Sequence, residues 1–358
     1  KMIKVIFFTE NGRGLAERIP DDKQMIDGRA GRTEANIEEA FSKKVPMVFI
    51  GAAGIAVRLI APYIKDKTTD PAVICIDEKG RFVIPLLSGH IGGANEIASR
   101  LASELGATAV ITTATDVNHT FAVDVFARNN GLGILNPSAI KNISSKVLNG
   151  EIVSVKSDST YRLYQEDYKK YMRPVQGNDE RPDIAIVGND WLVSILNAAG
   201  IDPFMPLPER FTREELLLNA GISSRCLYLY EKNYTVGIGC RKLTGYDEIF
   251  PFLKDVMSHK NLCMACVDSI SSIDIKKDEP GLLNLCAALG VPFNVYSAEE
   301  LKGAEGNFKS SPFVESVVGV DNVCERAAAL SAGHGSKKLV GKMQTERVTI
   351  SVYERGSR

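Results

Sequence analysis

Residues 81–116, RFVIPLLSGHIGGANEIASRLASELGATAVITTATD, decide the fold that we expect for this chain. They begin with a short apolar run, Phe82 to Leu87, that has the length of a strand. A glycine-rich turn follows at 88–93. Apolar residues then recur at three- and four-residue spacing over 94–105, which is typical of an amphipathic helix ending at Gly106. A second strand over 109–112 leads into a turn rich in hydroxyl groups. The stretch therefore predicts a β-α-β unit with polar turns after both strands.

The same alternation of strand-length runs and helical segments continues along the chain. It predicts an α/β protein of several domains, with mostly parallel sheets and helices on both faces. A chain of 358 residues is longer than one hydrophobic core usually supports. We expect an N-terminal α/β domain over residues 1–132, a small middle α/β domain over 133–232 and a C-terminal α/β domain over 233–358. The middle domain shows no chemical constellation.

Composition excludes several classes of protein. The formal net charge is −1, so the chain has no overall attraction to nucleic acid or to an acidic membrane surface. Its apolar runs are too short to span a bilayer, and its first residues lack the pattern of a secretion signal. The seven cysteines are scattered and odd in number, which argues against a disulfide framework. We expect a cytoplasmic protein without nucleic-acid or membrane partners.

Four glycine or hydroxyl turns follow predicted strands, at residues 51–54, 88–93, 112–116 and 239–244. Open α/β sheets bind ligands beyond the carboxyl ends of their strands, where glycine lets a ligand approach the backbone. Tight turns with close helix packing give the same pattern. No turn matches the phosphate-loop motif, and the G-x-x-G-G spacing at 89–93 differs from the dinucleotide fingerprint.

His90 is the main candidate for chemistry. It lies inside a glycine turn, where neither helix nor strand packing requires an imidazole, and it could serve as a general acid or base. A histidine that only caps the helix is the alternative. The carboxylate of Asp116 could orient His90 or simply cap the following turn. Asp124, on a predicted helix, is a weaker candidate, and a solvated loop position explains His119.

The cysteines have two interpretations. Cys263 and Cys266 form a C-x-x-C pair, but no second close pair completes a zinc site, so we expect both to face the core. Cys240 follows a predicted strand and precedes two cationic residues, Arg241 and Lys242. Those cations are expected to lower the pKa of its thiol and make it reactive; a turn in backbone contact is the simpler alternative.

Several motifs carry a family likeness. The chain resembles the cobalt-precorrin-5A hydrolase family of anaerobic cobalamin biosynthesis over about four-fifths of its length. Its C-terminal part also resembles a separate small protein of the aerobic pathway. The matching motifs are GIAVRLIAP from Gly54, DKTTDPAV from Asp66, PLLSGHIGGANEIA from Pro85, VITTATD from Val110, VGIGCR from Val236, DEPGLL from Asp278, SPFV from Ser311 and VGVDNVCERAAAL from Val318.

The resemblance implies a hydrolase that opens the δ-lactone of cobalt-precorrin-5A and releases acetaldehyde, leaving cobalt-precorrin-5B. It implies no separate cofactor and no resident metal, because the cobalt arrives within the substrate. We expect His90 as catalytic base, Asp116 as its partner, and backbone amides around residues 92–93 as oxyanion donors. The expected substrate-binding residues are Gly54, Arg58, Ser88, Gly89, Gly92, Gly93, Asn95, Thr113, Thr115, Gly239, Cys240 and Arg241.

The expected partner is the corrinoid precursor, held in a cleft between the N- and C-terminal domains near His90 and Cys240. A homodimer and transient contacts with neighbouring pathway enzymes are further expectations. The alternative from another class is a corrinoid-binding or scaffold protein that performs no reaction. A nucleotide-using α/β enzyme is the third interpretation.

Overall fold

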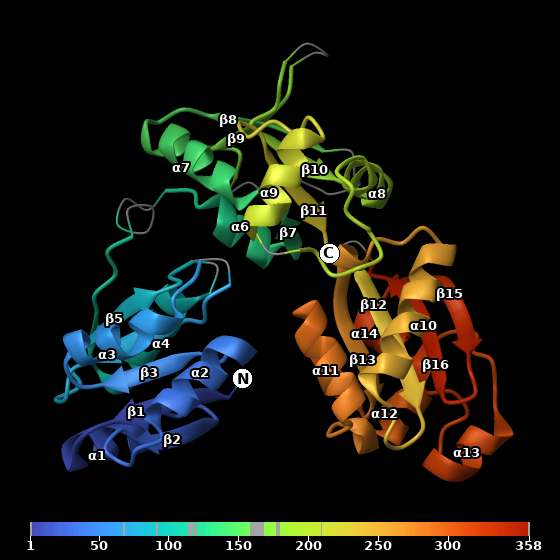
Figure 1. The fold of residues 1–358 in the computed structure, drawn as a ribbon, viewed down its shortest axis with the longest axis horizontal. Coiled ribbons are helices and arrows are strands. Elements are labelled where there is room, and N and C mark those ends of the chain that lie inside the picture. The colour runs from blue at the N-terminus through green and yellow to red at the C-terminus, as the bar shows by residue number, and fades with distance from the viewer. Residues whose placement is uncertain are drawn as a thin grey trace. The chain divides into compact units, whose positions relative to one another are not determined.

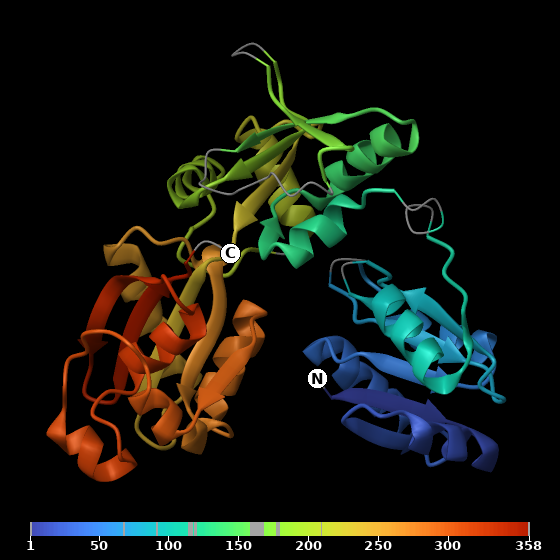
Figure 2. The same cartoon turned by 180° about the vertical axis from the view of Figure 1, so that it is seen from behind.

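The chain folds into two compact units, residues 1–126 and 127–358. The computed structural model describes residues 2–66, 69–90, 92–113, 117, 120–157, 168–176, 180–208 and 210–356. One sheet lies in the first unit and two lie in the second, and Figures 1 and 2 show them from opposite sides. The fold is therefore α/β with several sheets, as predicted. The boundaries expected at 132 and 232 stay predictions.

The first unit contains a six-stranded sheet covered on both faces. Its strands are β1 (Ile3–Phe7), β2 (Lys23–Asp27), β3 (Met47–Ile50), β4 (Val73–Ile76), β5 (Phe82–Leu87) and β6 (Thr108–Ala109), in the order β2-β1-β3-β4-β5-β6. One core gathers the buried residues of α1 (Glu10–Arg18) and α4 (Ala94–Leu105), and another gathers those of α2 (Thr33–Lys43) and α3 (Ala53–Ile60). Two helices thus pack on each face, as expected for a mostly parallel sheet.

One strand of this sheet reverses direction. β5 pairs antiparallel with β4, with Val73 opposite Leu87 and Ile76 opposite Val83, whereas β3 and β4 are parallel and β5 and β6 are parallel. The carboxyl ends of β5 and β6 therefore lie at one edge of the sheet, and those of β1, β3 and β4 lie at the other. This reversal decides which of the predicted turns can share a ligand.

The second unit begins with a five-stranded sheet of order β7-β11-β10-β8-β9. Its strands are β7 (Leu132–Ile134), β8 (Val153–Ser157), β9 (Met172–Pro174), β10 (Ile184–Val187) and β11 (Leu227–Glu231). The helices nearby in sequence are α6 (Val123–Asn129), α7 (Ile140–Leu148), α8 (Asn189–Ala198) and α9 (Arg210–Asn219). Among the described residues, no helix is both long and apolar enough to cross a membrane.

The last sheet has the order β14-β13-β12-β16-β15. Its strands are β12 (Tyr234–Cys240), β13 (Val267–Ile273), β14 (Phe293–Tyr296), β15 (Lys337–Gln344) and β16 (Val348–Glu354), the last two pairing antiparallel as expected. The flanking helices are α10 (Tyr246–His259), α11 (Pro280–Leu289), α12 (Ala298–Lys302), α13 (Pro312–Val318) and α14 (Cys324–Ala332). α14 packs so closely on β12 that a Cβ on Gly237 would lie 1.8 Å from the Cys324 carbonyl oxygen.

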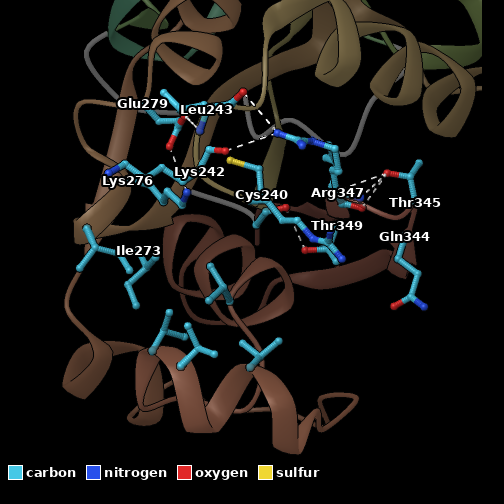
Figure 3. A pocket seen from close by; sticks show the side chains of 18 of the residues that line it. Cys240, Lys242, Leu243, Ile273, Lys276, Glu279, Gln344, Thr345, Arg347 and Thr349 are labelled. Carbon is cyan, nitrogen blue, oxygen red and sulfur yellow. Dashed lines mark hydrogen bonds and ion pairs between the residues drawn. The ribbon is translucent and has the colours of Figure 1, made fainter.

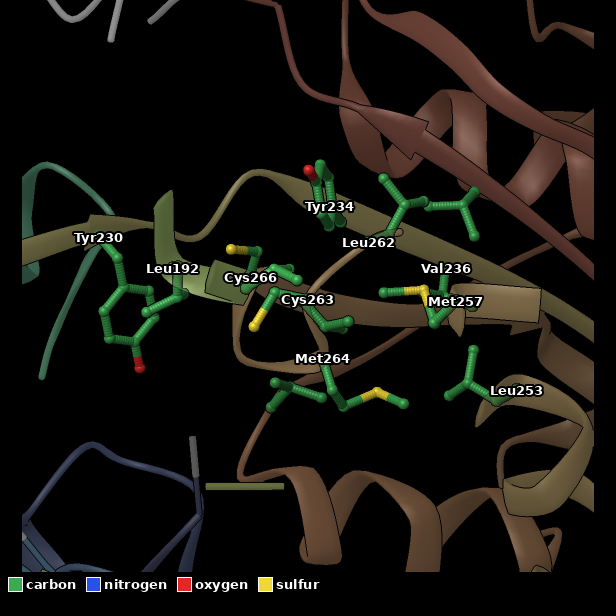
Figure 4. Close-up of a cluster of buried hydrophobic side chains, with 14 of the residues drawn as sticks. Leu192, Tyr230, Tyr234, Val236, Leu253, Met257, Leu262, Cys263, Met264 and Cys266 are labelled. Atoms are coloured by element: carbon green, nitrogen blue, oxygen red, sulfur yellow. The ribbon is translucent and has the colours of Figure 1, made fainter. Parts of the chain in front are cut away.

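The two sheets of the second unit share one hydrophobic core, part of which is drawn in Figure 4. Cys263 and Cys266 lie in that core and are at most 2% exposed, so the prediction that they face the core is confirmed. The backbone N–H of Cys263 donates to the side chain of Asn189 at 2.7 Å. This hydrogen bond links the start of α8 to the segment before β13 and gives a buried backbone N–H group the partner that it needs.

Candidate functional site

The turn between β5 and α4 is held in a strained conformation. Ser88 has a φ of 56°, in the left-handed region that residues with a side chain seldom adopt. Its hydroxyl donates to the carbonyl oxygen of Asp70 at 2.9 Å, and its own carbonyl accepts from the N–H of Ala94 at 3.1 Å. Ser88 is 8% exposed. These contacts fix the turn, and strain of this kind is characteristic of functional sites.

The glycines of the turn allow close approach of its own backbone. A Cβ on Gly92 would lie 2.4 Å from the Ser88 Cβ, and one on Gly89 would lie 2.7 Å from the Asn95 side-chain oxygen. The N–H of Gly93 donates to the carbonyl oxygen of His90 at 3.0 Å. In this conformation the Gly93 amide is therefore engaged within the turn and is not an available oxyanion donor.

Two predicted residues link the ends of β5 and β6. The Asn95 side-chain amide, on the first turn of α4, donates to the hydroxyl of Thr113 at 3.0 Å. Asn95 is 8% exposed. The structure thus brings Asn95 and Thr113 together at the sheet edge that carries the 88–93 turn.

His90 is paired with a carboxylate from the chain after β6. Its Nδ1 atom lies 3.2 Å from both carboxylate oxygens of Asp124, in the first turn of α6. The side chains are 12% and 9% exposed, respectively. Burial opposes ionisation of Asp124, but the hydrogen bond and the charge of His90 outweigh it, so the pKa of this carboxyl lies below its ordinary value. A carboxylate on Nδ1 orients the imidazole ring and stabilises its protonated form.

The expected partner of His90, Asp116, lies outside the described residues, as do Thr115 and His119. Asp124 was ranked as a weaker candidate, and the structure shows it in contact with His90. Its one sequence signal was a carboxylate near the start of a predicted helix, beside the apolar residues Val123 and Phe126. Asp70 belongs to the DKTTDPAV motif but was not singled out from the sequence; it is 6% exposed and its carboxylate accepts from the N–H of Lys65 at 3.0 Å.

Gly54 and Arg58 lie at the opposite edge of the sheet from the 88–93 turn. Both are in α3, which follows β3, and the N–H of Gly51 donates to Ile76 at the end of β4. The two residues are exposed, and a Cβ on Gly54 would lie 3.6 Å from the Arg58 guanidinium. They therefore do not join the edge that carries His90. Their expected role in substrate binding stays a prediction.

A pocket of about 920 Å³ opens in the second unit (Figure 3). It lies beyond the carboxyl ends of the parallel strands β12 and β13, where α/β sheets commonly bind ligands. The turn between β15 and β16 and one side of α13 complete its wall. The lining residues are Gly239–Leu243, Ile273, Ile275, Lys276, Asp278–Pro280, Ser311, Val314, Val317, Val318, Val323, Lys342 and Gln344–Thr349.

The structure places Gly239, Cys240 and Arg241 together in this pocket. Burial raises the pKa of the Cys240 thiol to about 11 and outweighs the nearby cations. The prediction of a lowered pKa was therefore wrong, because desolvation disfavours the thiolate more than the lysine and arginine charges favour it. Arg241 forms an exposed ion pair with Glu346 at 3.3 Å. Within the described ranges, no three metal-binding side chains gather into one group.

Comparison with known proteins gives one consistent result. Three family models match: Cobalamin synthesis G N-terminal over residues 35–116, Cobalamin biosynthesis central region over 121–199 and Cobalamin synthesis G C-terminus over 234–353. The cobalt-precorrin-5A hydrolase of Salmonella typhimurium is 36% identical over 88% of this chain and 83% of that protein. That of Priestia megaterium is 33% identical over 94% of this chain and 85% of that protein.

A shorter relative matches as well. Protein CobE of Sinorhizobium sp is 24% identical over 119 residues, which cover 33% of this chain and 77% of that protein. The expected partial likeness to a smaller protein is therefore confirmed.

Proposed function

Since the chain belongs to the cobalt-precorrin-5A hydrolase family, we propose that it opens the δ-lactone of cobalt-precorrin-5A and releases acetaldehyde. The observation that carries the chemistry is the pair formed by His90 and Asp124 at 3.2 Å in a strained strand-end turn. A histidine held by a carboxylate is an arrangement that general-base catalysis commonly uses. The known relatives supply the substrate, and this pair supplies a base.

In the first step, Nε2 of His90 takes a proton from a water molecule as its oxygen attacks the lactone carbonyl carbon. The ring C–O bond then breaks, so the carbonyl carbon gains a hydroxyl and the alkoxide of the two-carbon unit gains the proton from His90. Asp124 holds the imidazole by Nδ1 and stabilises the imidazolium that forms between the two transfers. General-base catalysis of this kind contributes about 10²- to 10⁴-fold.

In the second step, the same imidazole removes the proton from the hydroxyl group of the two-carbon unit. The bond between the two-carbon unit and the macrocycle breaks, the fragment leaves as acetaldehyde, and the electron pair stays on the macrocycle, where it is protonated. This is a retro-aldol cleavage. Asp116 stays the second carboxylate proposed for this site.

The experiment is a turnover assay with the purified chain and cobalt-precorrin-5A, in which acetaldehyde is measured. We expect release by the unmodified chain and a loss of about 10²-fold or more in His90→Ala. His259→Ala is the matched control, because His259 is an exposed histidine whose ring contacts the Asp255 carbonyl on its own helix. Near-native release by His90→Ala would refute the assignment of the base. A corrinoid carrier or scaffold releases no acetaldehyde.

A further inference from the structure

The pocket of the second unit has the size and place of a ligand site but lacks the pair of imidazole and carboxylate on which the chemistry above rests. Its volume of about 920 Å³ is at the upper end of the range of about 300–1,000 Å³ for small-molecule sites. None of its lining residues is a histidine. Its thiol, Cys240, has a pKa raised to about 11 by burial, so it is neutral at physiological pH. The pocket therefore offers a binding surface with neither an imidazole nor an ionised thiol.

Large apolar side chains stand exposed around the mouth of this pocket. Leu243, Ile275 and Val317 are 74%, 66% and 65% exposed, and they come from three separate segments. A cluster of exposed apolar residues on the rim of a pocket marks an interaction site, because leaving such surface in water is unfavourable. We call these three residues the apolar rim. It offers an apolar surface to a ligand that is itself large and apolar.

Backbone hydrogen bonds fix the position of Leu243 in its loop. Leu243 has a φ of 60°, and its backbone is held on both sides (Figure 3). Its N–H donates to the Glu279 carboxylate at 2.6 Å, and its carbonyl accepts from the Arg347 guanidinium at 3.3 Å. A strained residue persists only where its surroundings determine it, and such residues concentrate at ligand sites. The protein thus fixes an exposed leucine at the pocket mouth.

The charges of the pocket divide into paired and unpaired groups. Three of its five cations are ion-paired: Arg241 with Glu346 at 3.3 Å, Lys276 with Glu279 at 3.0 Å and Arg347 with Glu248 at 3.1 Å.

The other two lining cations, Lys242 and Lys342, have no acidic side chain within ion-pair distance in the described part of the chain. The lining carboxylate of Asp278 is exposed and likewise unpaired, so the three groups together leave one positive charge. Two free ammonium groups beside an apolar rim suit a ligand with carboxylates around an apolar body.

We propose that this pocket is the corrinoid-binding site of the chain, in which the apolar rim contacts the macrocycle while Lys242 and Lys342 bind its peripheral carboxylates. The identity of the ligand rests on the proposed function. Binding is then separable from the chemistry at His90, because the residues proposed to recognise the ring and its carboxylates are not those proposed to transfer protons.

The test is equilibrium dialysis of the full chain with cobyrinic acid, a corrinoid with free carboxylates, and with its neutral heptamethyl ester. Lys242→Ala/Lys342→Ala should bind the acid about tenfold more weakly than the unmodified chain and the ester equally well. Lys260→Ala/Lys337→Ala, which removes two exposed lysines outside the pocket lining, is the matched control and should bind both normally. Leu243→Asn, which retains a side chain tolerated in the left-handed region, should weaken binding of both probes.

The proposal is overturned if the unmodified chain does not bind cobyrinic acid, or if the double lysine variant binds it as tightly as the unmodified chain. Equal affinity of the unmodified chain for acid and ester would overturn it too. His90→Ala should bind the acid normally, and loss of binding there would contradict the separation of binding from chemistry. If the unmodified chain binds the probes as expected but yields no acetaldehyde, the pocket is supported and the hydrolase function alone fails.

Discussion

The turn at 88–93 and the pocket of the second unit differ in the types of residue that form them and in how deeply these residues are buried. The turn contains glycines and a strained serine, and it places a histidine beside a carboxylate of α6; both of these side chains are almost fully buried. The pocket is wide, with exposed apolar side chains and unpaired lysines at its mouth. A buried base held by a carboxylate suits one reacting bond, and a wide amphipathic pocket suits recognition of a large ligand.

This difference explains how a protein with a net charge of −1 can bind a polyanionic substrate. The positive charge is local, because acidic partners neutralise three of the five lining cations, and within the described part of the chain Lys242 and Lys342 remain unpaired. Affinity then depends on a few placed groups and not on the field of the whole molecule. It also means that variants of the two sites should fail in different assays.

Asp124→Asn gives the largest expected effect. The amide would keep the shape of the side chain but would no longer stabilise an imidazolium or select the required tautomer of His90, so acetaldehyde release should fall by about 10³-fold. Binding of cobyrinic acid should not change. Single-turnover kinetics and dialysis measure the two quantities, and Asp22→Asn, an exposed carboxylate of the same unit, is the control. A rate within about threefold of the unmodified chain would point to Asp116 as the functional partner.

Gly92→Ala should affect turnover next most strongly. The added Cβ would lie 2.4 Å from the Ser88 Cβ and 2.8 Å from its carbonyl oxygen, so the turn that carries His90 has to move. A displacement of about 1 Å costs about 10²-fold in rate, and overpacking costs about 1–3 kcal/mol of unfolding free energy. Gly54→Ala is the matched control for stability, because its Cβ meets nothing closer than 3.6 Å. Equal turnover in the Gly92 variant would show that the turn tolerates the shift.

Glu325→Gln tests the wall of the pocket. Glu325 is 2% exposed and accepts from the Lys309 N–H at 2.8 Å and from the Lys338 ammonium at 2.9 Å. It thereby holds the segment that leads into α13. Burial opposes ionisation of Glu325, but these bonds outweigh it and its pKa lies below the ordinary value. The variant should lose about 1–3 kcal/mol of unfolding free energy at neutral pH.

The contribution of the Glu325 carboxylate to the free energy of unfolding should depend on pH. A carboxyl whose pKa is lower in the folded state than in the unfolded state stabilises the fold at pH values above its unfolded pKa, about 4.3 for glutamate. That contribution is lost as the pH falls through the folded pKa. Urea unfolding should therefore show a shallower loss of stability on acidification in Glu325→Gln than in Glu305→Gln, an exposed control. Parallel curves for the two variants would contradict this account.

Local patterns allowed much of the fold to be predicted. The apolar spacing over 94–105 predicted α4 with the bounds that the structure has. The antiparallel direction of β5 could have been predicted from the sequence. Only five residues separate β5 from β4, and so short a connection can form a hairpin but not a parallel crossover. Because that direction was not predicted, Gly54 and Arg58 were grouped with the turn at 88–93.

The pairing of side chains was harder to predict, because it depends on where distant segments return. His90 and Asp124 are 34 residues apart, and no periodicity links them. The pocket joins Arg241 to a turn more than one hundred residues later. The pKa of Cys240 was predicted in the wrong direction because its sequence neighbours reveal charge but not burial, and burial dominates.

Asp278→Asn gives the smallest expected effect. It tests directly whether the charge of the pocket determines the affinity for ligand carboxylates. Asp278 is exposed in the lining and unpaired, so it repels the ligand carboxylates that Lys242 and Lys342 attract. Removing its charge should tighten binding of cobyrinic acid about two- to threefold, the size expected for exposed charges. The gain should disappear at high salt, since exposed charges are screened, and the neutral ester should show no gain. Dialysis at two salt concentrations decides the point: tighter binding of the ester would mean that Asp278 acts through shape or solvation and not through its charge.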